Sequence, residues 1–185
     1  MNNFRQINLP ILPLDDQLTD MLKKNLISWG IHNQICINST PSKTDDIFHG
    51  VASLEYDWNN KRKKEDGSLE VPKRDVPLQE KDFTELCNVF RKTYFEDVYN
   101  AMKEKFTIGR VRIMRSKPKT CLTWHTDPST RLHFPIKTQE GCYMVIQDEI
   151  KHLTQNEWWM TDTTMPHTAF NGSKESRIHL VAVIL

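Results

Sequence analysis

The sequence predicts an α+β protein in which early helices pack on one outer face of a β-sandwich or barrel. Two observations lead to this fold class. Apolar residues recur at helical spacing in two stretches before residue 107. From Gly109 onward, short runs rich in β-branched and aromatic residues follow one another at intervals of about 8 to 12 residues. A chain of 185 residues fits one domain with one core.

Two stretches have the periodicity of amphipathic helices. The first begins at Asp15 or Asp16, which are candidate N-caps, and is predicted to end at Gly30, a candidate C′ residue. The second extends over residues 81–106 without an internal Gly or Pro. This predicts one long helix or two abutting helices packed on a sheet.

Strands are predicted on both sides of the second helix. Residues 31–38 and 51–58 have strand composition between turn formers, whereas residues 59–81 are highly charged with both signs. We interpret this charged segment as a solvated loop that can fold over a site as a lid. The later predicted strands are 110–115, 121–124, 131–137, 142–147, 157–160 and 178–185.

The composition argues against several function classes. Twenty-five Lys and Arg against 24 Asp and Glu leave a net charge of +1, so we expect neither nucleic acid nor a membrane as a partner. The four cysteines form no CxxC pair, which predicts buried thiols in a reducing compartment. The N-terminus lacks the pattern of a signal peptide, and no stretch approaches the ~20 apolar residues of a spanning helix. A cytoplasmic protein is therefore expected.

Four polar residues in the last third of the chain indicate a metal centre. Residues i and i+2 of a strand share a face, so His125 and Asp127 can point into one cavity. His167 follows after several intervening strands, and Arg177 opens the last predicted strand. A His-x-Asp pair with one later His is the ligand set that holds iron(II) on one face and leaves the other positions open.

Each of these residues has a simpler interpretation when taken alone: a surface histidine, an Asx-turn aspartate, a turn histidine after proline, and an exposed strand end. Four such accidents in this order are far less probable than one site. Arg131 and His133 support the site, because they alternate on one strand directly after the His-x-Asp turn. An arginine fork beside an imidazole suits a carboxylate.

The last part of the chain contains ordered motifs: Trp124-His125-Thr126-Asp127, RLHFPIKT at 131–138, Gly141-Cys142, Trp159, Asp162-Thr163-Thr164, His167-Thr168-Ala169-Phe170-Asn171 and Arg177-Ile178-His179-Leu180. Together they resemble the aspartyl/asparaginyl β-hydroxylase family, a branch of the 2-oxoglutarate- and iron(II)-dependent dioxygenases. The resemblance covers roughly the last 75 residues and is specific in the order of its motifs.

This resemblance implies a double-stranded β-helix of the jelly-roll, cupin-like kind. We therefore expect a single dioxygenase domain over residues 1–185, with a helix-rich support in 1–106 that includes two strands. The metal-binding jelly-roll core is expected in 107–185.

The resemblance also implies roles for individual residues. His125, Asp127 and His167 match the ligands of Fe(II), although the animal peptide hydroxylases of the family carry glycine where Asp127 stands. This chain keeps the fuller ligand set. Catalysis would consume 2-oxoglutarate as co-substrate and O2.

Three further positions match the co-substrate site of the family. Arg177 matches the arginine that grips the distal carboxylate of 2-oxoglutarate. Arg131 and His133 match the Arg-x-His pair beside its proximal end.

Four more residues are candidates for lining the substrate or co-substrate pocket: Arg112, Trp124, Thr138 and His179. Arg112 and Arg115 should lie on opposite faces of their strand, so only one of them is expected in the cavity, with Arg110 on the side of Arg112. The remaining histidines and tryptophans are interpreted as surface or packing residues, with the tryptophans as alternative walls of the substrate mouth: His32, His49, His152, Trp158 and Trp159.

Two classes of function stay open on the sequence alone. The first is a hydroxylase acting on a C–H bond of an amino acid, free or in a peptide, or on another small molecule such as proline. The second is a non-catalytic jelly-roll module that binds a metal or a small anion. A third function, nucleic-acid demethylation, is disfavoured because the sequence lacks the basic groove that phosphate contacts require. The sequence does not predict the substrate or the oligomeric state.

Overall fold

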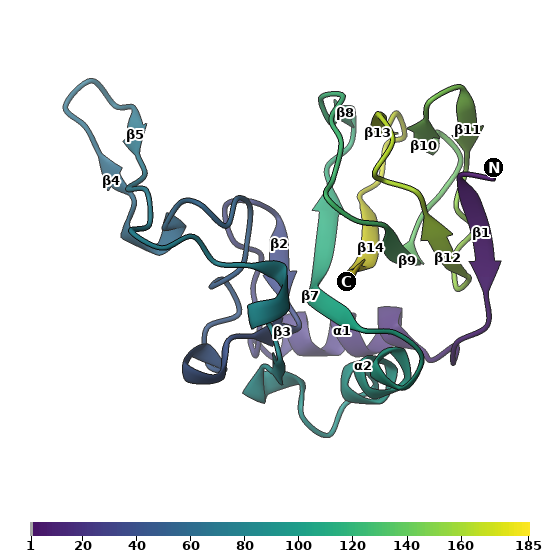
Figure 1. Cartoon of the computed structure of the whole chain (residues 1–185), viewed down its shortest axis with the longest axis horizontal. Helices are drawn as coiled ribbons and strands as arrows, with labels where there is room; N and C mark the ends of the chain where they lie inside the picture. Colours follow the sequence, from purple (N-terminus) through teal and green to yellow (C-terminus); the bar gives the residue numbers. More distant parts are fainter. Residues whose placement is uncertain (1) are drawn as a thin grey trace.

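The computed structural model describes residues 2–185 and confirms an α+β fold with a double-stranded β-helix core. A larger sheet has the order β1-β12-β9-β14-β7-β2, and a smaller sheet has the order β11-β10-β13-β8. From β7 to β14 the chain passes back and forth between the two sheets, which is the winding of a jelly roll. Figure 1 shows the smaller sheet above the larger one, with helices α1 and α2 beneath them.

The elements of the larger sheet come from both halves of the chain. Its strands are β1 (Phe4–Ile7), β2 (Gln34–Cys36), β7 (Ile108–Ser116), β9 (Arg131–Lys137), β12 (Trp158–Thr161) and β14 (Arg177–Ile184). The smaller sheet contains β8 (Thr120–Cys121), β10 (Cys142–Ile146), β11 (Glu149–Lys151) and β13 (His167–Asn171). Strands β1 and β2 thus extend the jelly-roll sheet with residues from the N-terminal segment.

Alternation along the central strands separates a packed face from a cavity face. On β9, Leu132, Phe134 and Ile136 are fully buried in the main core, whereas Arg131 and His133 point to the other side. Strands β7 and β14 divide in the same way. One face of the larger sheet therefore packs on the helices, and the opposite face lines a space between the two sheets.

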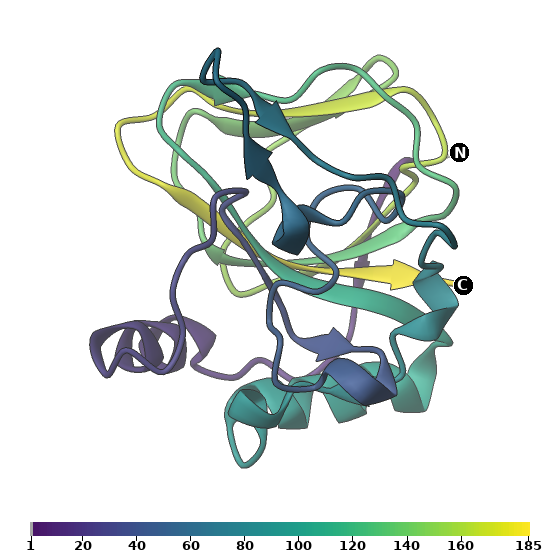
Figure 2. The same ribbon diagram turned by 90° about the vertical axis from the view of Figure 1, so that its left-hand side faces the viewer.

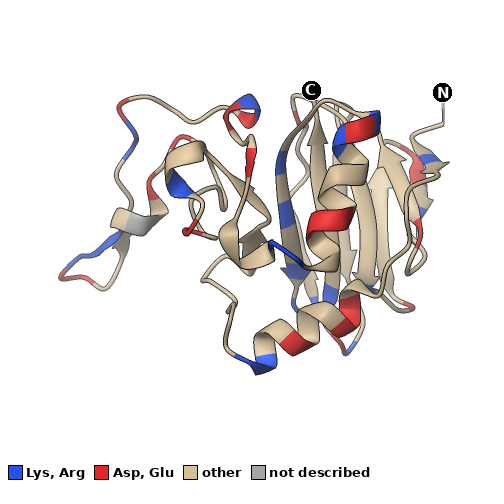
Figure 3. Cartoon of the chain, turned by 90° about the horizontal axis from the view of Figure 1, so that it is seen from below, with Lys and Arg blue, Asp and Glu red and all other residues tan. Residues whose placement is uncertain are grey.

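Helices α1 (Leu14–Lys23) and α2 (Tyr94–Lys105) cover the outer face of the larger sheet, as predicted (Figures 2 and 3). Buried apolar residues of both helices join one cluster with the packed face of the sheet. A smaller cluster, which includes Phe4, Ile146 and Trp159, packs residues of the two sheets against each other.

The predicted bounds of the first helix were wrong at both ends. The helix begins at Leu14 and ends at Lys23, well before Gly30. Leu26 N–H donates to the Met21 carbonyl over 3.0 Å and Asn25 N–H to the Leu22 carbonyl over 3.1 Å, with Asn25 at φ +55°. This is a Schellman ending in which asparagine takes the left-handed position that the sequence analysis gave to glycine.

The prediction of helix from residue 81 was also wrong, because only Tyr94–Lys105 is α-helical. Lys92 has a φ of +60°, which interrupts a right-handed helix, and the Thr93 side chain then accepts from the Phe95 N–H as an N-cap. Upstream lie the 3-10 turns η3 (Glu80–Asp82) and η4 (Asn88–Phe90) around strand β6 (Glu85–Leu86).

The early strands are shorter than predicted. Residues 31–38 yield β2 and the start of β3 (Asn38–Ser39), whereas residues 51–58 form turns that end in the 3-10 turn η2 (Trp58–Asn60). Another 3-10 turn, η1, spans Pro41–Lys43. The sequence prediction missed β1, β11 and β13.

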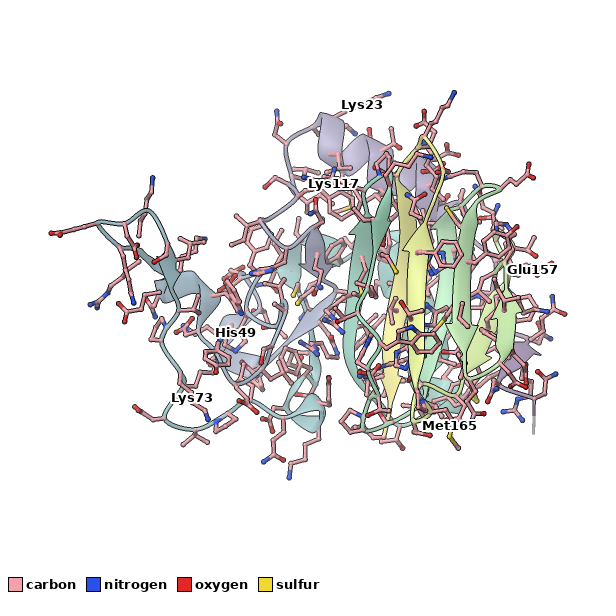
Figure 4. The ribbon with its side chains drawn as sticks, turned by 90° about the horizontal axis from the view of Figure 1, so that it is seen from above. Lys23, His49, Lys73, Lys117, Glu157 and Met165 are labelled. Carbon is pink, nitrogen blue, oxygen red and sulfur yellow. The ribbon has the colours of Figure 1, made fainter. Side chains whose placement is uncertain are left out.

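The charged segment forms a small hairpin from β4 (Arg62–Lys63) and β5 (Leu69–Glu70). It projects away from the sheets and carries both signs of charge (Figures 1 and 3). Figure 4 shows Lys73, which follows the hairpin, and His49 to one side of the sandwich. In this structure the segment is not the predicted lid, since none of the residues that line the cavity between the sheets lies in 59–81.

Asn38 joins the N-terminal segment to the sheet through three backbone groups. Its side-chain amide donates to the carbonyls of Phe83 and Gly109 over 2.6 and 2.9 Å, and its Oδ1 accepts from Val111 N–H over 2.7 Å. The side chain is fully buried. These three bonds connect β3 to the backbone of β7 and of Phe83.

Asn38→Ala is therefore expected to lower the free energy of unfolding by about 3 kcal/mol, because it leaves buried backbone groups without partners. Urea unfolding followed by circular dichroism measures the change. Asn100→Ala, at an exposed position of α2, is the matched control and should change stability by less than about 0.5 kcal/mol. Equal urea midpoints for the two variants would contradict the role given to Asn38.

The expectation of buried thiols is confirmed in part. Cys36, Cys87 and Cys142 are buried free thiols as predicted, but Cys121 is exposed, because its strand lies at the edge of the smaller sheet. Among the described residues, no helix has the length and apolar character needed to cross a membrane.

Candidate active site

A cavity of about 440 Å³ lies between the two sheets. The cavity face of the larger sheet supplies most of its polar wall. Residues from β13, from the loop before β9 and from the segment around β2 complete it. The lining includes Arg110, Arg112, Arg131, Arg177, His125, Asp127, His133, His167, His179, His32 and Gln34.

His125, Asp127 and His167 come together at one place in this cavity. One ligand atom from each side chain lies within 4.8 Å of the others. His125 and His167 face each other through a backbone bridge, with N–H to carbonyl distances of 3.1 and 2.9 Å. The Asp127 N–H donates to the Thr163 carbonyl over 2.8 Å, which fixes the third member.

The route by which His125 and Asp127 share the cavity differs from the predicted one. They do not alternate on a strand, because β8 ends at Cys121. His125 occupies an isolated bridge position and Asp127 lies in the following loop. The pair is thus positioned by backbone hydrogen bonds to β13 and to the loop before it.

Both histidines present the same ring nitrogen to the cavity. The Nδ1 of His125 lies 2.8 Å from the Thr123 carbonyl, and the Nδ1 of His167 lies 3.0 Å from the Met165 carbonyl. A carbonyl can only accept, so each Nδ1 carries the proton and each Nε2 keeps a free lone pair. Such outer hydrogen bonds orient histidines for metal binding. Burial also lowers the pKa of His167, which favours the neutral form that binds a metal.

Asp127 is held as a carboxylate by a chain of charges. Burial alone would raise its pKa, but the hydrogen bond and the charge of Arg131 outweigh burial and lower it. Arg131 Nε donates to Asp127 Oδ2 over 2.9 Å. Glu80 lies 3.8 Å from Arg131 Nη1 and binds Arg110 through both carboxylate oxygens, at 2.8 and 3.2 Å.

Glu80 is the residue of this charged network that the sequence analysis missed. It lies at the end of a charged segment, where nothing in its neighbours distinguishes it from the other acidic residues of the loop. Its position between two buried arginines of different strands becomes visible only in the fold. Glu80 binds Arg110 and lies near Arg131, and Arg131 in turn orients the candidate metal ligand Asp127.

Arg177 lies at the far end of the cavity face without an acidic partner. Its side chain is buried, and burial lowers its pKa to about 10. Its Nη2 donates to His179 Nδ1 over 3.0 Å, and no ion pair joins it to a carboxylate of the described residues. A buried cation of this kind is costly unless an anion binds it.

His179 and His133 continue the polar surface from Arg177. Burial first, and then the charge of Arg177, hold the pKa of His179 well below its usual range, and the same causes lower the pKa of His133 to about 3. Both rings are therefore neutral at pH 7. Because Arg177 donates to His179 Nδ1, the proton of the ring lies on Nε2, which has no partner among the described residues.

Of the other predicted pocket residues, two line the cavity and two do not. Arg112 and His179 line the cavity, whereas the exposed Trp124 and the half-buried Thr138 do not. The lining also excludes Trp158 and Trp159, which pack in the two apolar clusters. Arg115 borders the cavity as well as Arg112, contrary to the prediction that only one of them would.

His32 is a second lining residue that the sequence analysis misplaced as a surface or packing histidine. Its ring packs edge-on against Trp58, with centroids 4.1 Å apart, and its Nε2 is buried without a partner. No periodic pattern marks it, because it lies in a turn before β2.

Sequence comparison now places these residues in a family. The pattern of the aspartyl/asparaginyl beta-hydroxylase family matches residues 50–185. The chain belongs to this family. The match begins well upstream of the motifs from Trp124 to Leu180 and includes Glu80, α2 and β7.

Individual relatives are more distant. L-proline cis-4-hydroxylase of Rhizobium meliloti (strain 1021) is 36% identical over 94 residues, which are 48% of this chain and 34% of that protein. The chain thus matches about a third of the length of this curated relative.

Among solved structures, a viral collagen prolyl hydroxylase from Paramecium bursaria Chlorella virus-1, in complex with 2OG, aligns with 99% of this chain and 95% of its own, at 12% identity and a TM-score of 0.48. A 2OG-Fe(II) oxygenase family oxidoreductase from Burkholderia pseudomallei aligns with 50% of this chain and 49% of its own, at 15% identity and a TM-score of 0.37.

The donor set of this site fits the metal that the family implies. Two neutral imidazoles and one carboxylate are the facial ligand set of non-haem iron(II) oxygenases. Both Nε2 lone pairs are free, and the Asp127 carboxylate is ionised. Among the described residues, no fourth histidine, cysteine or carboxylate joins this group, so positions remain for other ligands of the ion.

Proposed function

We propose that the protein is a 2-oxoglutarate- and Fe(II)-dependent dioxygenase that hydroxylates a C–H bond of an amino acid, free or in a peptide. The observation that carries this proposal is the juxtaposition of two features in one cavity. Three metal-binding side chains lie at one end of the cavity face, and a buried arginine without a carboxylate lies at the other. A metal-chelating dianion suits both.

The residues divide the work of binding. His125, Asp127 and His167 would hold the ion on one face. Arg177 would bind the distal carboxylate of 2-oxoglutarate, because its buried guanidinium offers donors and a charge that nothing else neutralises. When bound, iron(II) and 2-oxoglutarate supply the chemistry: one oxygen atom of O2 enters the substrate C–H bond, and the other enters succinate as CO2 is released.

Arg131 and His133 would lie beside the proximal end of the co-substrate. Arg131 also fixes Asp127 through its Nε, so a single side chain would orient both a metal ligand and the molecule that chelates the ion. His133 and His179 stay neutral and place ring nitrogens along the path from Arg131 to Arg177. The unpartnered Nε2–H of His179 would donate to a dianion here without protonating it.

The test is formation of succinate by the purified chain with iron(II), ascorbate and 2-oxoglutarate, measured with and without candidate amino acids and peptides. We expect a slow uncoupled release of succinate, which rises when a substrate is present. A gain of one oxygen in the substrate, read by mass spectrometry, accompanies the rise. Bound iron without succinate above the buffer level would instead favour a non-catalytic metal-binding module.

A further inference from the structure

Arg112 is a second buried arginine of the cavity that has no acidic partner. It lies on the cavity face of β7 and is 8% exposed. Its Nη1 donates to the side-chain oxygen of Gln34 over 2.9 Å, while its buried Nε has no partner among the described residues. A guanidinium held in this way keeps donors free for a ligand that enters the cavity.

The charges of the cavity leave Arg112 uncompensated. Arg110 is paired with Glu80, and Arg131 is paired with Asp127 and, at longer range, with Glu80. No ion pair joins Arg112 or Arg177 to a carboxylate of the described residues. One dianion that chelates the metal and reaches Arg177 therefore leaves Arg112 still without a partner.

The sheet register separates Arg112 from the path of the co-substrate. Arg177 lies opposite Ser116 of β7, whereas Arg112 lies opposite Val181, four residues further along β14. Four residues of a strand span about 13 Å, so the two arginines enter the cavity at different levels of the sheet. Val181 also pairs with His133 on its other side, so Arg112 and His133 lie about 10 Å apart across the sheet.

The neighbours of Arg112 lie at the β2 edge of the larger sheet, beside β7. Gln34 comes from the edge strand β2, and Ala52 donates its N–H to the same Gln34 oxygen over 3.1 Å. His32, with its unpartnered buried Nε2, lies on the same segment. These residues form a small polar compartment that the candidate metal ligands and Arg177 do not use.

We infer that Arg112, oriented by Gln34, binds the carboxylate of a free amino-acid substrate. The inference rests on the proposed function and specifies the substrate class for the same site. A cavity of about 440 Å³ is near the small end of ligand pockets, which range from roughly 300 to 1,000 Å³, and it must also hold 2-oxoglutarate. A small carboxylate fits this space and supplies the missing negative charge, whereas a residue inside a peptide lacks a main-chain carboxylate.

Binding without turnover tests this inference. The full chain is loaded with Zn(II) and N-oxalylglycine, an inert analogue of 2-oxoglutarate, and binding of N-oxalylglycine is recorded by calorimetry. The twenty proteinogenic L-amino acids are then titrated one by one, each beside its own carboxamide. We expect at least one amino acid to bind, and its carboxamide to bind about ten- to a hundredfold more weakly, because a charged hydrogen bond is lost.

Variants locate the effect. Arg112→Met should reduce amino-acid binding by the same factor while N-oxalylglycine still binds, and Arg62→Met, on the exposed hairpin, should change neither. Equal binding of acid and amide by the wild-type chain would overturn the inference, even if Arg112→Met fails to fold. Unchanged amino-acid binding by a folded Arg112→Met variant would also overturn it. The same holds if no free amino acid binds, whether or not an aspartate-containing peptide does.

The same samples separate this inference from the proposed function. If N-oxalylglycine does not bind to the zinc-loaded chain, the proposed co-substrate site is wrong. If N-oxalylglycine binds and the wild-type chain releases succinate, but the amino acids and their amides are not distinguished, only the role of Arg112 is wrong.

Discussion

His167→Ala is expected to lower iron affinity and succinate formation by more than about 100-fold. Loss of a residue that merely supports a ligand typically costs 10- to 100-fold, and His167 is a candidate ligand itself. The His167 side chain is 4% exposed, and its Nε2 lies 3.8 Å from Asp127 Oδ2. Removal also leaves the Met165 carbonyl without its donor, although that loop is held by further backbone bonds.

Iron content after gel filtration and succinate release measure the two effects separately. His152→Ala is the matched control, because His152 is a half-buried histidine outside the cavity whose Nδ1 bonds to the Cys142 carbonyl. It should keep iron and activity. If His167→Ala retained iron at the wild-type level, the metal site would have to lie elsewhere.

Asp127 deserves a separate comparison, since its carboxylate both faces the metal site and neutralises Arg131. The sequence resemblance implies that some members of the family manage with glycine at this position. In this chain the loss would leave Arg131 with only the more distant Glu80, so the cavity would gain an uncompensated positive charge. In the proposed function the carboxylate would thus be a metal ligand and also the charge partner of Arg131.

The sequence was most informative where chemistry and local alternation coincide. Strand β9 spans the predicted residues 131–137, where Leu132, Phe134 and Ile136 alternate with Arg131, His133, Pro135 and Lys137. Its register fixes Arg131 and His133 on the cavity face. Arg177 lies at the start of β14, where the sequence analysis placed it at the opening of the last predicted strand.

The prediction failed where tertiary contacts override local pattern. Lys92 takes a left-handed conformation in a stretch without Gly or Pro, so no breaker marked the end of the non-helical segment. Asn25 ends α1 five residues before the glycine that seemed to end it. Glu80 and Gln34 acquire their roles from arginines that are distant in sequence, and neither lies in a motif.

Arg177→Met is expected to change stability and ligand binding in opposite directions. The buried guanidinium has no carboxylate partner among the described residues, and burial lowers its pKa, so its charge disfavours folding at pH 7. Replacement of an unpaired buried cation by an apolar side chain of similar length should raise the melting temperature of the ligand-free chain. Affinity for 2-oxoglutarate should fall by about 100-fold, because a buried carboxylate loses its charged partner.

Thermal unfolding with and without N-oxalylglycine measures both effects in one experiment. A ligand that binds only the folded state raises the melting temperature, so the wild-type chain should be stabilised by the analogue and Arg177→Met should not. Arg62→Met, at an exposed arginine of the β4-β5 hairpin, should match the wild-type chain in both measurements. A variant that is less stable without ligand yet equally stabilised by it would assign Arg177 to the structure of the sheet and not to the co-substrate.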